Sequence, residues 1–221
     1  MLDTAAAGST TPLFLAGIGL AGMCLGLLAD GLVRRVLPQL AGDASWRERT
    51  KTAAAAFVLS TLLAWRFGIA AELPAYLLLG IAAIPLARID IVHHLLPNRI
   101  VGPLLAAGVV LLGGAALVTG AAGDVLRGAA GSAILLIFYL ILALTSRNGL
   151  GMGDVKLAAP LGLYLGYLGW SQLFYGGALA FVVGGLASVF LVLKNREDKP
   201  KEVAYGPSML AAGLSVILLL R

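Results

Sequence analysis

Residues Gly149–Gly162 read GLGMGDVKLAAPLG, a glycine-rich turn that runs into an apolar segment. The ionisable Asp154 stands where that segment begins, and Lys156 follows two residues later. A carboxylate is costly to place at the edge of a hydrophobic helix, so this position needs a chemical reason. The turn lacks the third-glycine spacing of a dinucleotide fingerprint and the Gly-Lys-Ser/Thr ending of a phosphate-binding loop. We therefore do not expect nucleotide binding.

The chain around this stretch is strongly apolar. Of its 221 residues, 60% are hydrophobic and 12% are charged, whereas soluble domains average about 25% charged residues. A membrane-spanning helix needs about 20 apolar residues. We therefore predict an all-α fold, a polytopic membrane helix bundle in which residues 1–221 form a single domain in the lipid bilayer. The eight predicted transmembrane segments lie near 12–33, 53–71, 74–92, 100–119, 128–145, 155–169, 173–193 and 206–220.

The 29 glycines are about twice the ordinary number for such a length. Small residues spaced four apart let transmembrane helices approach closely. The pairs Gly22/Gly26 and Gly162/Gly166 have this spacing. We interpret nearly all the glycines as helix-packing residues.

The basic residues predict the orientation of the bundle, because cytoplasmic loops carry an excess of Lys and Arg. With eight spans, all but Arg66, Arg127 and Arg221 of the 16 Lys and Arg residues lie on one side. This side includes the two longest polar stretches, 34–51 and 194–205, which we predict to be cytoplasmic loops. Both termini then lie outside. Membrane orientation accounts for the basic charge, so we expect no nucleic-acid partner.

Two of the eleven acidic residues remain unexplained by polar loops or ion pairs. Asp30, by contrast, precedes Arg34 by one helical turn and is expected to pair with it. Asp90 closes the third apolar segment in IPLARIDIVHHLLPNRIVG, and Asp154 opens the sixth. Either acid alone could be a helix-end charge, as Asp154 would be at the positive end of its helix. Both map to the cytoplasmic membrane edge, however, which makes them candidate functional residues.

Two carboxylates that share a site cannot both ionise cheaply, so one pKa rises and the pair holds one proton. The ionised member can take a proton from water while the protonated member polarises an amide carbonyl. This is the chemistry of an aspartic protease, which needs no metal and no other cofactor. Glycines beside Asp154 would let an extended substrate backbone approach closely.

These motifs resemble those of the type IV prepilin peptidases, a family of membrane aspartyl proteases. GMGDVKLAAPLGLYLG is similar to that family's Gly-x-Gly-Asp signature with its Val-Lys-Leu run, and IDIVHHLLPNRIV is similar to its other aspartate motif. GLLADGLVRRVLP resembles the end of the family's first helix, with Asp30 near a usual Asn. VAYGPSMLAAG resembles its closing Gly-Pro segment.

The resemblance implies a set of site residues. Asp90 and Asp154 would be the catalytic acids, and no metal is implied. Lys156 is interpreted as an interface charge whose stem lies in the membrane, although a role in holding the loop or tuning Asp154 stays open. His93 and His94 occupy a variable stretch of the family pattern. The other motif residues, which would lie near the substrate, are Gly151, Gly153, Pro97 and Asn98.

The resemblance also implies a function: a bacterial inner-membrane endopeptidase whose active site faces the cytoplasm. Its partner would be a prepilin or pseudopilin with a basic leader and an apolar helix. Many members carry a cysteine-containing cytoplasmic insert linked to N-methylation. Residues 36–51 are too short for it and contain no cysteine, so N-methyltransferase activity and S-adenosylmethionine use are not expected.

Two alternatives remain. A presenilin-like intramembrane protease also has a Gly-x-Gly-Asp motif, but it pairs this motif with Pro-Ala-Leu, whereas this chain has GPSML at Gly206–Leu210. A non-enzymatic, proton-coupled transporter or assembly protein could use the aspartates to carry protons or bind partners.

Overall fold

The computed structural model describes residues 11–41, 45–145, 151–194 and 205–220, and every regular element in this part of the chain is an α-helix. The all-α prediction is therefore confirmed. The helices form two compact units, Met1–Pro85 and Leu86–Arg221. Helix α4 contributes its first turns to one unit and its last turns to the other. The expectation of a single domain stays a prediction.

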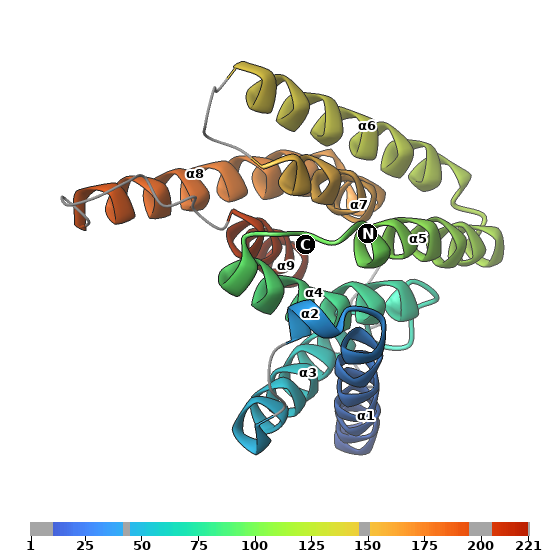
Figure 1. Cartoon of the computed structure of the whole chain (residues 1–221). Helices are drawn as coiled ribbons and strands as arrows, with labels where there is room; N and C mark the ends of the chain where they lie inside the picture. Colours follow the sequence, from blue (N-terminus) through green and yellow to red (C-terminus); the bar gives the residue numbers. More distant parts are fainter. Residues whose placement is uncertain (1–10, 42–44, 146–150, 195–204, 221) are drawn as a thin grey trace. The chain divides into compact units, whose positions relative to one another are not determined.

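Each predicted apolar segment coincides with one helix, and the short α2 (Pro38–Ala41) is additional (Figure 1). Among the described residues, α1, α4, α5 and α6 are long and apolar enough to cross a membrane, and Trp170–Leu186 and Gly206–Leu219 are shorter apolar helices. The chain is thus a polytopic helix bundle, while the count of eight spans and the outside termini remain predictions. The eight helices are α1 (Pro12–Val36), α3 (Trp46–Phe67), α4 (Leu73–His93), α5 (Asn98–Thr119), α6 (Ala122–Thr145), α7 (Met152–Leu168), α8 (Trp170–Lys194) and α9 (Gly206–Leu219).

In the first unit, α1 and α3 lie side by side (Figure 1). Gly22 and Gly26 face the small residues Ser60 and Ala56 of α3 so closely that an added methyl group at either glycine would overlap them. The predicted packing role of this glycine pair is confirmed. The predicted Asp30–Arg34 pair is also present, with 2.7 Å between the Arg34 Nε and Asp30 Oδ2 atoms.

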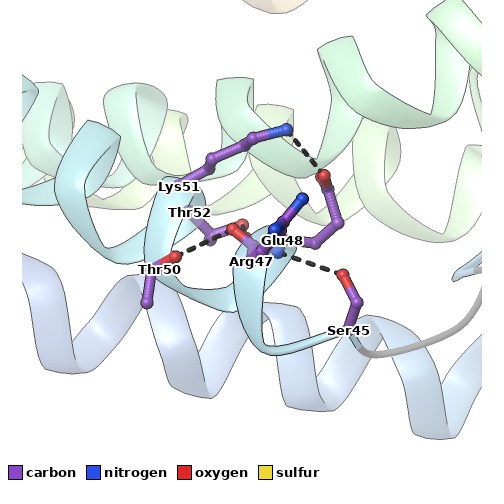
Figure 2. A network of polar contacts seen from close by, with 6 residues as sticks. All are labelled: Ser45, Arg47, Glu48, Thr50, Lys51 and Thr52. Carbon is purple, nitrogen blue, oxygen red and sulfur yellow. Dashed lines mark hydrogen bonds and ion pairs between the residues drawn. The ribbon is translucent and has the colours of Figure 1, made fainter.

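Helix α3 begins at Trp46, well before its apolar segment, so much of the polar stretch 34–51 is helical. Residues 42–44 in that stretch, and 195–204 in the other predicted loop, lie outside the described residues. The side chain of Ser45 caps the helix by accepting a hydrogen bond from the Glu48 N–H at 3.3 Å. The first turns of α3 are linked by further local contacts (Figure 2), which join Lys51 to Glu48, Thr50 to Arg47 and Thr52 to Glu48.

In the second unit, the backbones of α6 and α7 come into direct contact where glycines of the two helices face each other. A methyl group at Gly162 would lie 2.8 Å from the Gly131 carbonyl carbon, and one at Gly166 would lie 2.8 Å from the Arg127 carbonyl oxygen. The predicted packing role of Gly162 and Gly166 is therefore confirmed. Arg127 of α6 also binds α7 through hydrogen bonds. Its Nε and Nη2 atoms donate to the carbonyl oxygens of Gly166 (2.7 Å) and Tyr167 (2.5 Å). These contacts cap the C-terminal end of α7.

Helix α7 is the centre of the second unit, because it also packs on α5, α8 and α9. Nearly all of its residues from Asp154 to Tyr167 are buried. Gly108 of α5 makes room for the fully buried Tyr164, whose hydroxyl oxygen would lie 2.9 Å from a methyl group at Gly108. The position of Asp154 is thus determined by helices on several sides.

We predict that Gly162→Ala destabilises the protein by about 1–3 kcal/mol, because the new methyl group meets backbone atoms that cannot move away. Thermal unfolding of the detergent-solubilised protein measures the change. Gly114→Ala is the matched control, because a methyl group at that helical glycine has no neighbour within 4 Å among the described residues. Equal stability of the two variants would contradict the packing described for α6 and α7.

Candidate active site

Asp90 lies in the last turn of α4, where the chain leaves the helix. The His94 N–H donates to the Asp90 carbonyl oxygen at 2.9 Å, and His94 itself has a left-handed backbone (φ 52). This conformation ends the helix and turns the chain toward Leu96 and Pro97. Pro97 then serves as the N-cap of α5, so Asn98 is the first residue of the next helix.

The Asp90 side chain is buried, with 4% of the residue exposed. Its Oδ2 atom accepts a hydrogen bond of 2.9 Å from the backbone N–H of Gly206, the first residue of α9. A helix N-terminus carries partial positive charge and unpaired N–H groups, which favour a nearby carboxylate. The start of α9 thus supplies a hydrogen-bond donor that offsets part of the cost of burying the Asp90 carboxylate.

Asp154 lies in the first turn of α7 and is also buried, with 6% exposed. Its backbone N–H donates to the carbonyl of the N-cap residue Gly151 at 3.0 Å. Within the described part of the chain, the buried Oδ1 atom of Asp154 has no hydrogen-bond partner. A buried oxygen without a donor costs about 1–3 kcal/mol, a penalty more typical of functional sites than of passive cores.

The structure brings the two acids together at one end of the second unit. Asp90 binds Gly206 and Asp154 follows Gly153, and both glycines pack closely against Leu96. Leu96 lies between the start of α9 and the start of α7. Its Cδ1 atom would lie 3.2 Å from a methyl group at Gly206, and its Cβ atom 3.0 Å from one at Gly153. The end of α4 and the starts of α7 and α9 therefore meet around one buried leucine.

The structure assigns Gly153 a neighbour that differs from the one expected. The sequence suggested that the glycines beside Asp154 admit a substrate backbone. At Gly153 the close neighbour is the chain's own Leu96, whose backbone nitrogen would lie 3.3 Å from an added methyl group. Gly151 is exposed, and a methyl group there would make only ordinary contacts, the nearest with Asp154 Oδ2 at 3.4 Å.

Lys156 has a partner that the sequence did not predict. Its Nζ atom donates to the Asn98 Oδ1 atom at 3.0 Å, so one signature motif binds the other across 58 residues of sequence. Both residues are exposed. The contact links the start of α7 to the first residue of α5. Whether Lys156 also holds the glycine loop or tunes Asp154 stays open.

Sequence reasoning missed the contacts of Gly206 and Leu96. The GPSML stretch was matched only as a weak resemblance, because nothing in one sequence shows which backbone N–H will reach a distant carboxylate. As for metals, the described residues contain no group of three or more His, Cys, Asp or Glu that could hold an ion.

These features define a class: polytopic helical membrane proteins with two buried aspartates at one end of the bundle. A model of the type IV leader peptidase family matches residues 75–189, which include both aspartates. This match covers more than half of the chain, so the chain belongs to the type IV leader peptidase family. No solved structure matches the chain.

Relatives of this chain bear the name prepilin leader peptidase/N-methyltransferase. The protein from Stutzerimonas stutzeri is 30% identical over 163 residues, which are 73% of this chain and 55% of that protein. The protein from Aeromonas hydrophila is 33% identical over 148 residues (65% and 49%). The protein from Bacillus subtilis (strain 168) is 31% identical over 157 residues (69% and 58%). The chain spans about half the length of these curated relatives.

We predict that Lys156 and Asn98 are coupled by up to about 1 kcal/mol, the usual range for an exposed charged contact. Thermal unfolding of Lys156→Met, Asn98→Ala and the double variant gives this energy as a double-mutant cycle. Asn98→Asp retains an acceptor oxygen and should preserve the coupling. Fully additive effects would mean that the contact contributes nothing to stability.

Proposed function

We propose that this protein is an aspartyl endopeptidase that removes the leader peptide from type IV prepilin-like proteins. The observation that carries the proposal is the pair of buried carboxylates, Asp90 and Asp154, each at a helix end in the matched family region. The site would lie at the cytoplasmic edge of a bacterial inner membrane, as the distribution of basic residues indicates.

The proposed chemistry uses the two carboxylates as one unit that holds a single proton. One aspartate removes a proton from the attacking water, while the other donates a hydrogen bond to the scissile carbonyl oxygen. The Gly206 N–H fixes one oxygen of Asp90. A bound water or peptide group would supply the partner that Asp154 Oδ1 lacks among the described residues.

Apolar side chains beside the acids suit a substrate with a hydrophobic helix. Ile91, Val92 and Leu95 follow Asp90 and are each more than half exposed, as is Met152 just before Asp154. The basic loops would repel a basic leader, so we infer that docking relies on the apolar helix and the two acids. The substrate's peptide bond would then reach the acids where its helix leaves the bilayer.

We further propose that this chain is a peptidase without N-methyltransferase activity. The relatives' names include that activity, but residues 36–51 hold no cysteine and are too short for the insert associated with it. Incubation with substrate and S-adenosylmethionine should yield a cleaved product with an unmodified N-terminus. Mass spectrometry of that N-terminus checks the prediction, and a methylated product would refute it.

We predict that Asp90→Asn and Asp154→Asn each reduce cleavage of a co-expressed prepilin at least about 100-fold, because each removes one member of the acid–base pair. Both substitutions keep the side-chain volume, so the proteins should remain folded. Immunoblotting of precursor and mature prepilin in membranes measures the cleavage.

Asp124→Asn is the matched control, since Asp124 is a partly exposed acid at the start of α6 that pairs with Arg127. It should process substrate like the wild type. Normal processing by either active-site variant would exclude the proposed mechanism. A cut inside the apolar helix, mapped by mass spectrometry, would instead indicate an intramembrane protease.

A further inference from the structure

Tyr205 immediately precedes the glycine that binds Asp90, and it is anchored on α8. Its hydroxyl group donates to the Phe181 carbonyl oxygen at 2.9 Å. Its ring lies directly over Gly184, where an added methyl group would overlap the ring atoms. Tyr205 is itself buried, with 6% exposed. Two independent contacts therefore fix this residue on one helix.

From these contacts we propose that Tyr205 is a positioning residue that holds the Gly206 N–H on the Asp90 carboxylate. The proposal rests on the proposed peptidase function and identifies a residue outside the acid pair that orients Asp90. A continuous path of contacts runs from the α8 backbone through the Tyr205 side chain to the Gly206 amide and then to Asp90 Oδ2. None of the groups between the α8 backbone and Asp90 is itself catalytic.

The fit around Gly206 leaves little freedom for this amide. A methyl group at Gly206 would lie 2.7 Å from Asp90 Oδ2 and 3.2 Å from Leu96 Cδ1. The glycine therefore lets the α9 backbone come close enough for its N–H to reach the buried carboxylate. A small displacement of Tyr205 moves the neighbouring amide by a similar amount, and hydrogen bonds weaken steeply with poor geometry.

The consequence for catalysis is specific. Tyr205 orients a group that acts in the chemical step, so disturbing it should lower kcat and leave KM nearly unchanged. Misplacement of a catalytic group by about 1 Å can cost about 100-fold in rate. A residue that served only to stabilise the fold would lower the amount of active enzyme and the melting temperature, without changing the turnover of the folded fraction.

Gly184→Ala and Gly185→Ala form a matched test of this path. The first places a methyl group in the Tyr205 ring, while the second places the same group where no atom of the described residues lies within 4 Å. We expect Gly184→Ala to lower kcat about 10- to 100-fold at nearly constant KM. Gly185→Ala should retain wild-type kinetics. The fraction of folded protein is measured in detergent, and kcat is calculated per folded enzyme.

Tyr205→Phe is the milder second variant, which covers the case in which Gly184→Ala fails to fold. It keeps the ring and removes only the hydrogen bond to Phe181, so kcat should fall about 3- to 10-fold. Tyr205→Leu removes the ring as well, so it should lower kcat further than Tyr205→Phe does. Wild-type kcat in both Tyr205→Phe and Gly184→Ala would overturn the proposal.

A second readout does not depend on substrate. Dicyclohexylcarbodiimide labels carboxyl groups in apolar surroundings. Mass spectrometry measures the rate at which it labels Asp90. Loss of the amide contact should raise this rate about threefold or more in Gly184→Ala and Tyr205→Phe, but not in Gly185→Ala. If the wild type cleaves no prepilin, the peptidase function fails, and the labelling still decides the positioning role. Unchanged labelling in both variants would refute it.

Discussion

The structure of the second unit depends on how an apolar helix bundle accommodates two carboxylates. Burying an ionisable group costs several kcal/mol unless a hydrogen bond or opposite charge compensates. This chain uses helix N-termini for that purpose: the first N–H of α9 binds Asp90, and Asp154 sits in the first turn of α7. The ends of α4, α7 and α9 therefore have to converge. Leu96 packs where they meet, against both Gly153 and Gly206.

The same arrangement explains why α9 begins with a glycine. A donor N–H can reach a buried carboxylate only if its own residue has no side chain in the way, which requires glycine at Gly206. The tight turn after α4 must also return the chain to the bundle within a few residues. His94 achieves this with a left-handed backbone, a conformation that histidine tolerates better than branched residues do.

Much of this could be predicted from the sequence, because apolar length and small-residue spacing are local signals. The eight helix positions, the close-packed Gly22/Gly26 and Gly162/Gly166 pairs and the Asp30–Arg34 pair all rest on residues near one another in the sequence. The contacts that complete the site are different. Gly206 reaches Asp90 across 116 residues and Lys156 reaches Asn98 across 58. One sequence carries no signal for such pairings or for the contact of Gly153 with Leu96, and the expected closeness of Gly153 to a substrate stays a prediction.

The backbone contact between α6 and α7 has a mechanical consequence. Side chains can change rotamer to absorb a displacement, but peptide groups in direct contact cannot, so helices packed through glycine resist sliding and rotation. Arg127 pins the far end of α7 to α6 as well. Asp154 lies in the first turn of this tightly packed helix. The Asp90 side of the site is held differently, through the Leu96 side chain and the Gly206–Asp90 hydrogen bond, which can rearrange more readily than packed backbones.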